Sequence, residues 1–291
     1  MMNLQIAVAA LVILAPLVLQ SQPQPDPSQS PVVLVLPEMD KAVVRRDVVF
    51  ATPSTGPLRF DLYRPREAAA TEALPAVVFI SGGADVRAWK WYESYGRLAA
   101  ARSMVGVVPE KRYPRGFEGM QTGYADTDSV LGYLRRNASS LGIDPDRICV
   151  WAFSAGGRLM SMALAENARV RCIVGFYPLA DASGEFASVA DTLERDRLLS
   201  RYSPSHVLRR RGSIAPPVFL VRAGRDTPVI NESIDRFVAA ATAANADFTF
   251  VNYPEGLHGF DAYNDTATSR RIIRDAFDFI IRRTAAAKSP Q

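Results

Sequence analysis

Residues 148–157 read Ile-Cys-Val-Trp-Ala-Phe-Ser-Ala-Gly-Gly, an apolar run that stops at Ser154 and continues into small residues. The run is short and rich in β-branched and aromatic side chains, which is typical of a buried parallel strand. Beyond the glycines, the leucines and methionines of residues 159–164 have a spacing that suits a packed helix. A corner between a buried strand and a helix exposes a serine for nucleophilic attack. Ser154 is therefore the candidate nucleophile.

The corner departs from the usual serine pentapeptide at one position. Glycine commonly stands two residues before and two residues after the serine, because the sharp turn leaves no room there for a large side chain. Gly156 occupies the second place, whereas Ala152 stands in the first. Alanine is the smallest available replacement, but the pentapeptide alone is weak evidence, so other motifs have to support it.

Length and composition indicate one α/β domain with a large core and a short tail. The chain has 291 residues, of which 48% are hydrophobic. Its net charge of +4 comes from 34 Lys and Arg, mostly arginine, against 30 Asp and Glu. These charges are interleaved along the chain, so they do not indicate nucleic-acid binding. We expect the dense basic run, residues 209–211, to be a solvated loop, with binding of an anionic substrate or surface as the alternative.

The first residues form a unit of their own. Residues 6–19 are apolar and uncharged, and a polar, Pro-rich segment follows over 20–31. The apolar stretch is shorter than the roughly 20 residues of a membrane-spanning helix, which favours a signal peptide. No Lys or Arg precedes the apolar core. An uncleaved N-terminal anchor is therefore the alternative, and it would be the chain's membrane contact.

These features predict a secreted or periplasmic protein with four consecutive segments. They are a signal peptide over 1–21, a Pro-rich linker over 22–39, a catalytic domain over 40–285 and a disordered tail over 286–291. Export permits disulfides. Cys149 and Cys172 lie in successive predicted core strands, where free buried thiols are the ordinary state of cysteine. We therefore expect free thiols, with a disulfide as the alternative.

Strands and helices alternate beyond the linker, which predicts a mostly parallel sheet covered by helices on both faces. Eight strands are expected at 43–50, 58–63, 76–80, 104–108, 148–153, 170–176, 218–221 and 248–253, the first two as a hairpin. Helices are expected at 89–101, 126–139, 155–168, 230–244 and 266–283. The segment 181–213, between strands six and seven, has no strand character and is expected to be a short inserted cap or lid.

A serine nucleophile needs a base to accept its proton. His258 lies in a Gly-flanked loop after the last predicted strand, and loops at the carboxyl ends of parallel strands are where α/β sheets place their chemistry. His206, in the inserted segment, is expected to be structural. His258 is therefore the candidate base.

The base in turn needs a carboxylate that orients it and stabilises its charged form. Asp226 follows the seventh predicted strand through the turn Ala223-Gly224-Arg225. The competing acids are Asp181, Glu232 and Asp235. The chain order of Ser154, Asp226 and His258 is the order found in α/β-hydrolases, which makes Asp226 the candidate acid.

An oxyanion formed during acyl transfer needs hydrogen-bond donors. Ala155 offers its backbone N–H at the start of a helix, where the helix dipole also favours negative charge. The sequence Ile80-Ser81-Gly82-Gly83-Ala84 follows the third predicted strand and offers further amides. A tight turn would also favour glycine, but this loop follows the strand that carries oxyanion donors in such folds.

Together these motifs resemble those of the serine α/β-hydrolases of the acetyl-esterase and dienelactone-hydrolase-like group, over residues 40–285. The resemblance is carried by the glycine-containing loop at 80–84, the segment 141–156, Tyr202-Ser203-Pro204, Gly224-Arg225-Asp226 and His258-Gly259-Phe260. Related esterases commonly have His-Gly-Gly-Gly in the first loop, where this chain has Ser81 and Ala84 at the outer positions. The resemblance implies Gly83, Ala84 and Ala155 as oxyanion donors.

The resemblance implies an α/β-hydrolase fold and ester hydrolysis through an acyl-enzyme on Ser154, without a cofactor. Dienelactone hydrolases proper use a cysteine nucleophile, so the serine points to the esterase side. The absence of a recognisable set of metal ligands in the sequence disfavours metal chemistry. A peptidase resembling the catalytic domain of prolyl oligopeptidases and a non-catalytic binding protein are the alternatives.

The expected substrate is a small-molecule ester with a short acyl group, because the inserted segment is too short for a large cover. Several aromatic residues follow the predicted site strands and either line the mouth of the site or belong to the core: Trp89, Trp91, Tyr92, Tyr177 and Phe260.

Overall fold

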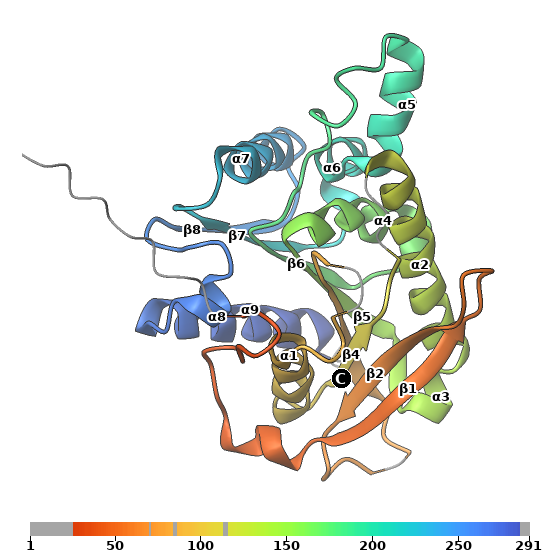
Figure 1. The fold of residues 1–291 in the computed structure, drawn as a ribbon, viewed down its shortest axis with the longest axis vertical. Helices are drawn as coiled ribbons and strands as arrows, with labels where there is room; N and C mark the ends of the chain where they lie inside the picture. The colour runs from red at the N-terminus through yellow and green to blue at the C-terminus, as the bar shows by residue number, and fades with distance from the viewer. Residues whose placement is uncertain (1–25, 70, 84–85, 113–115, 286–291) are drawn as a thin grey trace, which may run out of the picture.

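The computed structural model describes residues 26–69, 71–83, 86–112 and 116–285. Eight strands form one sheet in the order β1-β2-β4-β3-β5-β6-β7-β8 (Figure 1). Their bounds are β1 Val43–Ala51, β2 Leu58–Arg64, β3 Leu74–Ile80, β4 Val105–Pro109, β5 Ile143–Phe153, β6 Cys172–Phe176, β7 Val218–Ala223 and β8 Phe248–Tyr253. β2 runs antiparallel to both β1 and β4, and the remaining pairs are parallel. The expected mostly parallel sheet of eight strands is thus confirmed.

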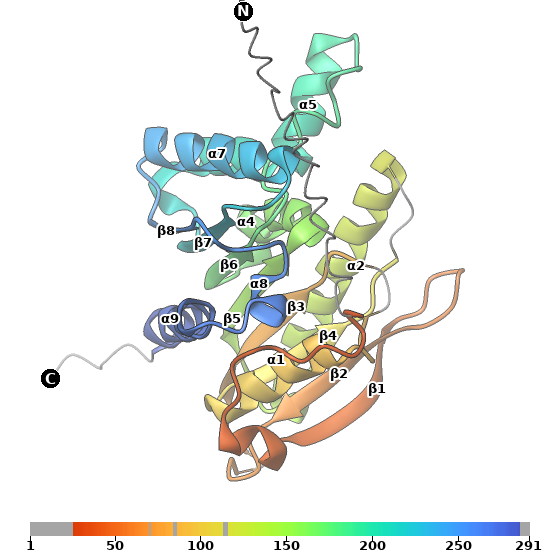
Figure 2. The same ribbon diagram turned by 60° about the vertical axis from the view of Figure 1, so that its left-hand side comes forward.

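Helices cover both faces of this sheet. The α-helices are α1 Lys90–Ala101, α2 Gly116–Arg136, α3 Ala138–Leu141, α4 Met160–Leu164, α5 Thr192–Tyr202, α6 Pro204–Arg211, α7 Pro228–Ala243, α8 Phe260–Tyr263 and α9 Ala267–Thr284. Short 3-10 helices are η1 Pro37–Lys41, η2 Ser154–Leu159, η3 Glu166–Ala168 and η4 Gly212–Ile214. Buried residues of α1 and α9 pack on one face, and those of α2, α4, α6 and α7 pack on the other. Figures 1 and 2 show the sheet between these two layers.

Residues 148–153 of the central strand β5 are apolar without interruption, and the layers around the sheet explain why. Successive side chains of a strand point to opposite faces. Val150 and Ala152 belong to the core beneath α2 and α4, whereas Trp151 and Phe153 belong to the core beneath α1 and α9. Because helices cover both faces here, residues 148–153 are all buried and apolar, whereas residues 144–147 nearer the start of β5 are not buried.

The two cysteines form a disulfide, so the expectation of free thiols is wrong. β5 and β6 are neighbours, and their register places Cys149 directly opposite Cys172. The Cα atoms of this pair are 4.8 Å apart, within the range that a disulfide bridges. The sequence places both cysteines in strands, but it does not give the register that brings them together.

Two helices differ from the sequence expectation. α2 begins at Gly116, ahead of the expected start at residue 126, although its first turns contain three glycines. Packing of Met120 in the core compensates for the weak helix propensity of these turns. The expected helix 155–168 is divided into η2, α4 and η3.

The inserted segment between β6 and β7 is helical. It contains α5 and α6, and α5 stands out from the body at the top of Figure 1. Its residues Phe186, Leu199 and Tyr202 pack with Met120 of α2 in a small core of their own. The basic run Arg209-Arg210-Arg211 forms the last turn of α6 rather than a loop, where positive charge complements the helix dipole.

The described part of the expected linker is packed against the domain. The amide of Val33 donates to the carbonyl of Asp261 at 2.7 Å, and that of Lys90 donates to the carbonyl of Ser28 at 2.9 Å. Val32 and Leu34 are buried. The expected signal peptide, 1–21, and the expected tail, 286–291, lie outside the described residues. Within the described ranges, no helix combines the length and the apolarity that crossing a bilayer requires.

Candidate active site

Ser154 occupies a strained corner at the end of β5. Its φ angle is 51°, which is uncommon for a residue other than glycine and typical of functional corners. A Cβ on Gly156 would lie 2.4 Å from the carbonyl oxygen of Ser81, and one on Gly157 would lie 2.3 Å from Cβ of Pro178. The Ser154 carbonyl accepts a hydrogen bond of 2.8 Å from the amide of Leu179. Glycines and this hydrogen bond therefore allow the strand to turn sharply at the serine.

Ala152 fits the corner because its neighbours leave room for a methyl group. It is fully buried, and its partner in the adjacent strand β6 is Gly175, which has no side chain. The glycine usual at this place is therefore not required here.

Asp226 and His258 form a hydrogen-bonded pair. Nδ1 of His258 lies 2.6 Å from Oδ2 of Asp226, and the amide of Thr227 donates to Oδ1 of Asp226 at 2.6 Å. The Asp226 side chain is only 1% exposed, whereas that of His258 is 39% exposed. A carboxylate bonded to Nδ1 leaves Nε2 as the nitrogen that can accept a proton.

The three candidate residues lie at the same edge of the sheet. Ser154 directly follows β5, the Asp226 turn follows β7 and the His258 loop follows β8, so all three stand at carboxyl ends of parallel strands. Tyr177, which follows β6 between them, places its ring centroid 4.7 Å from that of His258. The fold therefore assembles at one edge the residues that the sequence suggests.

The second histidine and the acid Asp181 belong to the anchor of the inserted segment. Nδ1 of His206 lies 3.1 Å from Oγ of Ser203 and 3.2 Å from Oγ of Ser205. Asp181 accepts hydrogen bonds from Ser205 and from Nε of Arg236. Burial alone would raise the pKa of Asp181, but hydrogen bonds from Ser205, Ser183 and Arg236 hold it below its ordinary value. Asp181 thus fastens α6 and α7 to the end of β6.

The other competing acids lie on α7 and pair with arginines. Oδ1 of Asp235 lies 3.0 Å from Nε of Arg222, and Oε2 of Glu232 lies 3.7 Å from NH1 of Arg236. Both carboxylates are largely exposed. Asp226 is the acid that the structure places against His258.

The loop Ser81–Gly82–Gly83, called the glycine loop below, lies against the serine. A Cβ on Gly82 would lie 3.3 Å from Oγ of Ser154 and 3.3 Å from the amide nitrogen of Ala155. The carbonyl of Gly83 accepts hydrogen bonds from Oγ of Ser81, at 2.8 Å, and from Nζ of Lys111. Of the expected oxyanion donors, Ala155 directly follows the serine, Gly83 follows Gly82, which is the loop residue in contact with Ser154, and Ala84 lies outside the described residues.

Sequence reasoning missed Asp261, which is fully buried behind the site. Its carboxylate accepts hydrogen bonds from Nε1 of Trp91 at 2.8 Å, from the hydroxyl of Tyr95 at 2.7 Å and from the hydroxyl of Tyr177 at 2.6 Å. Burial raises the pKa of Asp261, although these donors oppose the shift. The carboxylate thereby fixes Tyr177, whose ring contacts His258.

Four of the aromatic residues that could have lined the mouth belong to the core. Trp91, Tyr92, Tyr177 and Phe260 are buried and pack with the residues of α1 and α9. No sequence signal separates the two roles, because a core ring and a pocket ring follow the same strands.

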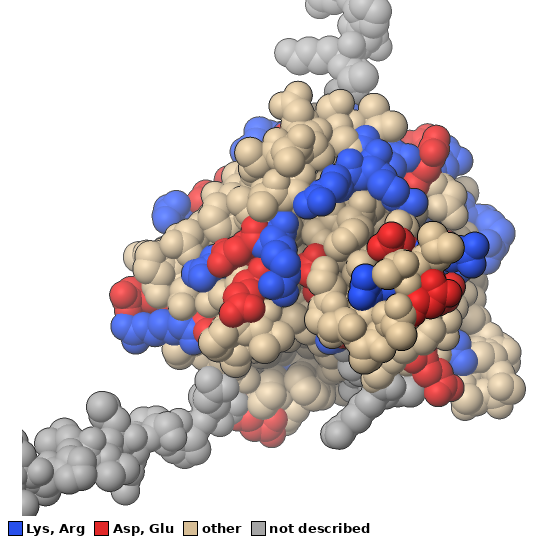
Figure 3. Space-filling view, turned by 90° about the horizontal axis from the view of Figure 1, so that it is seen from above, with Lys and Arg blue, Asp and Glu red and all other residues tan. Residues whose placement is uncertain are grey.

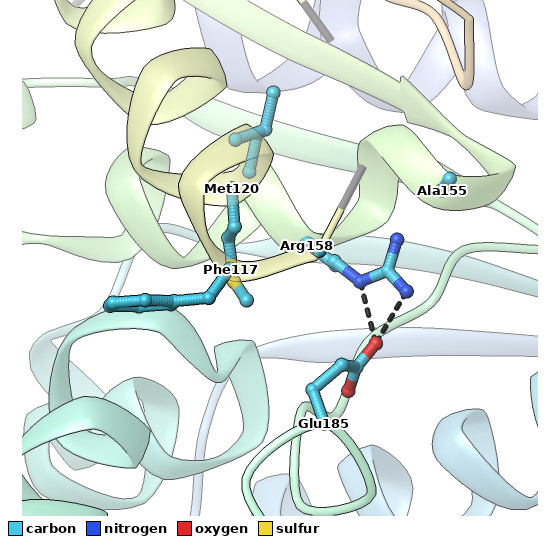
Figure 4. Close-up of a pocket in the computed structure, with 7 residues that line it drawn as sticks. Phe117, Met120, Ala155, Arg158 and Glu185 are labelled. Carbon is cyan, nitrogen blue, oxygen red and sulfur yellow. Dashed lines mark hydrogen bonds and ion pairs between the residues drawn. The ribbon is translucent and has the colours of Figure 1, made fainter. Parts of the chain in front are cut away.

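A pocket of about 150 Å³ opens beside Ala155 (Figure 4). Figure 4 shows the guanidinium of Arg158 facing the carboxylate of Glu185 at one side of the pocket, with Nε of Arg158 2.7 Å from Oε1 of Glu185. Its lining comes from the start of α2, from η2 and from the inserted segment: Gly116, Phe117, Met120, Ala155, Arg158, Leu159 and Glu185. The inserted segment thus supplies one wall of a small, largely apolar pocket next to the serine.

The surface around this end of the molecule carries both signs of charge. Figure 3, seen from above the view of Figure 1, shows Lys and Arg side chains lying beside Asp and Glu side chains. Among the residues that the structure describes, no group of three or more His, Cys, Asp or Glu side chains is arranged to hold a metal ion.

Comparison with known proteins places the chain among esterase-like sequences. The sequence model of the BD-FAE family matches residues 60–234. Esterase LipC of Mycobacterium tuberculosis is 27% identical, over 84% of this chain and 66% of the relative. An isoprenylcysteine alpha-carbonyl methylesterase of Arabidopsis thaliana is 26% identical, over 74% of this chain and 56% of the relative. The chain therefore spans about two thirds or less of the length of these curated relatives.

Among solved structures, a thermophilic esterase of Thermogutta terrifontis with bound propionate is similar, with a TM-score of 0.70 and 22% sequence identity. The match covers 87% of this chain and 98% of that structure. The similarity shows that the chain has the α/β-hydrolase fold that its motifs suggest.

Proposed function

The chain belongs to the BD-FAE family, and we propose that it is a serine esterase that hydrolyses carboxylic esters with small acyl groups. The observation that carries the proposal is the Asp226–His258 hydrogen bond of 2.6 Å at the sheet edge where Ser154 follows β5. The relatives named as esterases support the same activity.

In the proposed mechanism, Oγ of Ser154 attacks the ester carbonyl while Nε2 of His258 accepts its proton. Asp226 keeps the proton on Nδ1 and stabilises the imidazolium that forms. The carbonyl oxygen becomes an oxyanion, for which amides of the glycine loop and of Ala155 are the proposed donors. His258 then protonates the leaving alcohol, and water, activated by the same base, attacks the acyl-enzyme and releases the acid.

The pocket beside Ala155 supports a small substrate group. A cavity of about 150 Å³ that is lined by apolar side chains accommodates a group of roughly the size of benzene, and the pocket here has about that volume. Phe117, Met120 and Leu159 supply its apolar surface, and the Arg158–Glu185 pair lies along one side. We propose that it holds the acyl group of the ester. The structure of a similar esterase contains propionate, an acid with a small acyl group.

We also propose that the protein is exported, as its apolar N-terminal segment predicts. The Cys149–Cys172 disulfide supports this proposal, because disulfides persist mainly in oxidising compartments. Detection of the protein in culture medium or periplasm, with a mature N-terminus near residue 21, would test the location. Recovery in the membrane fraction with an intact N-terminus would instead indicate an anchor.

The activity is tested with p-nitrophenyl acetate and butyrate, comparing the wild type with Ser154→Ala. Turnover by the wild type, with the variant reduced by at least 10³-fold, is expected from the loss of a nucleophile. The matched control is Ser129→Ala, which removes an exposed hydroxyl on α2. A wild type that turns over neither ester would refute the proposal.

The identity of the nucleophile is tested with an organophosphate. Structures of the similar Thermogutta esterase include a form phosphorylated by paraoxon, so we expect paraoxon to phosphorylate Ser154 and inactivate the protein. Mass spectrometry should place the adduct on the peptide that contains Ser154 and find none in Ser154→Ala. Cleavage of peptide substrates without ester turnover would favour a peptidase, and binding without turnover a non-catalytic protein.

A further inference from the structure

Lys111 is a buried lysine next to the candidate site, at the end of β4. It is only 4% exposed, and its ammonium donates a hydrogen bond to the carbonyl of Gly83. The hydroxyl of Ser81 donates to the same carbonyl at 2.8 Å. Burial of an ammonium group is costly, so its position directly behind the glycine loop requires an explanation.

We propose that Lys111 is a positioning residue that holds the glycine loop in the conformation in which it stabilises the oxyanion. The inference rests on the proposed esterase function, because it concerns the transition state of that reaction. A glycine has no Cβ, and its backbone rotates more freely than that of any other residue. Two donors on the Gly83 carbonyl replace this missing steric restraint, since they limit the rotation of Gly83 about its own backbone bonds.

The position of the loop matters because the loop touches the nucleophile. Gly82 lies so close to Ser154 that an added Cβ would be 3.0 Å from the serine Cβ. A shift of Gly83 would therefore move its neighbour relative to Oγ of Ser154. Oxyanion donors act through being fixed before the reaction begins, and misplacement by about 1 Å can cost 10²-fold in rate.

Glu110, the residue before Lys111, contacts the chain beyond the glycine loop. Its Oε1 lies 3.0 Å from Nε of Arg87. Arg87 also donates from NH1 to Oδ1 of Asp61 at 2.7 Å. Glu110 and Lys111, the two residues that follow β4, thus contact Arg87 and Gly83 respectively. This arrangement favours a positioning role over simple filling of the core.

The pKa of Lys111 lies near neutral pH. Burial lowers the pKa of Lys111 to about 7, and the charge of Asp126 opposes the shift. Among the described residues, the charge that acts on it is Asp126 of α2, which is bonded to Arg112, whereas Glu110, its neighbour in the chain after β4, is bonded to Arg87. A charged donor forms a stronger hydrogen bond than a neutral one. We therefore expect the restraint on Gly83, and with it kcat, to weaken as the pH rises above about 7.

The test compares the wild type with Lys111→Met and with Lys41→Met, an exposed lysine of η1. For p-nitrophenyl butyrate, we expect Lys111→Met to lower kcat by about 10- to 100-fold while KM changes by less than about threefold. Lys41→Met should match the wild type. The decline of kcat above about pH 7 should be present in the wild type and absent in Lys111→Met.

Ser81→Ala provides a second, smaller perturbation of the same carbonyl. We expect a modest loss of kcat, and a combined loss in the double variant that differs from the product of the single losses, because both donors bind one atom. Thermal unfolding monitors the fold of each variant. If Lys111→Met does not fold, Ser81→Ala decides: raised KM with unchanged kcat would overturn the inference.

A folded Lys111→Met with kcat within twofold of the wild type would also overturn it. Different results would refute the proposed esterase function and the positioning role of Lys111. A wild type without ester turnover refutes the proposed function and this inference with it, whereas an active wild type with an unaffected variant refutes the positioning role alone.

Discussion

Nδ1 of His258 and Oδ2 of Asp226 lie 2.6 Å apart, although the residues belong to different loops and are 32 positions apart in the chain. The contact forms because β7 and β8 are parallel neighbours, so the loops that follow them leave the sheet at the same edge. The carboxylate is buried whereas the imidazole is partly exposed. Asp226 therefore anchors the pair within the protein, whereas His258 stays accessible from the site.

Asp226→Asn should remove most of the esterase activity without unfolding the protein. The amide has the shape of the carboxylate but cannot stabilise the imidazolium, and it permits the wrong histidine tautomer. We expect kcat to fall by about 10³- to 10⁴-fold. Steady-state kinetics measure the loss, with Asp235→Asn on the exposed side of α7 as the control. Full activity in Asp226→Asn would show that another group orients the base.

Removal of the buried carboxylate of Asp261 should destabilise the fold. Asp261→Ala leaves the donors on Trp91, Tyr95 and Tyr177 without their acceptor, and each buried donor left unsatisfied costs about 1–3 kcal/mol. We expect the free energy of unfolding to fall by at least about 3 kcal/mol in urea denaturation. Asp265→Ala, an exposed carboxylate nearby, should change it by less than about 0.5 kcal/mol.

The buried charge of Lys111 should make stability depend on pH. Its pKa is about 7 in the fold, against 10.5 for a solvated lysine. Between these values the unfolded chain binds more protons than the folded one, so the contribution of Lys111 to the free energy of unfolding rises with pH across this window. Lys111→Met removes the contribution.

From pH 7 to pH 10, the free energy of unfolding of the wild type should therefore rise relative to that of Lys111→Met. Urea denaturation at several pH values measures it, with Lys41→Met as the control. A difference that is constant over this window would show that Lys111 has an ordinary pKa.

The disulfide should contribute to stability. Replacing both Cys149 and Cys172 with alanine is expected to lower the free energy of unfolding by about 2–4 kcal/mol, because the cross-link restricts the unfolded chain. Urea denaturation with and without reductant measures the effect. Reductant should destabilise the wild type, but leave the double variant unchanged. Equal curves for the wild type under both conditions, with free thiols detected before denaturation, would contradict the bond.

Enlarging the pocket should change the preference for acyl length. Met120→Ala removes a side chain that lines it. We expect kcat/KM for the hexanoate ester to rise about tenfold relative to that for the acetate ester, since each methylene that is accommodated is worth roughly that factor or more. Leu193→Ala, an exposed apolar residue of α5, is the control. An unchanged ratio would mean that this pocket does not hold the acyl chain.

The sequence by itself determined the strands and the candidate residues of the site. Ser154 could be proposed because it directly follows an apolar run at a tight corner, and Asp226 and His258 could be proposed because they lie in the loops after later predicted strands, in the chain order of α/β-hydrolases. Local pattern sufficed for these features. It did not suffice for the early start of α2, where tertiary packing of Met120 outweighs the glycines.

Only the tertiary structure decided which of these residues meet. Strand register placed Cys149 opposite Cys172, sheet order placed Asp226 rather than Asp181 against His258, and burial turned Asp261 and Lys111 from ordinary charges into internal hydrogen-bonding groups. The sequence does not indicate which distant residue a polar side chain will contact. Partner and burial depend on contacts between segments far apart in the chain, and these contacts exist only when the sheet has formed.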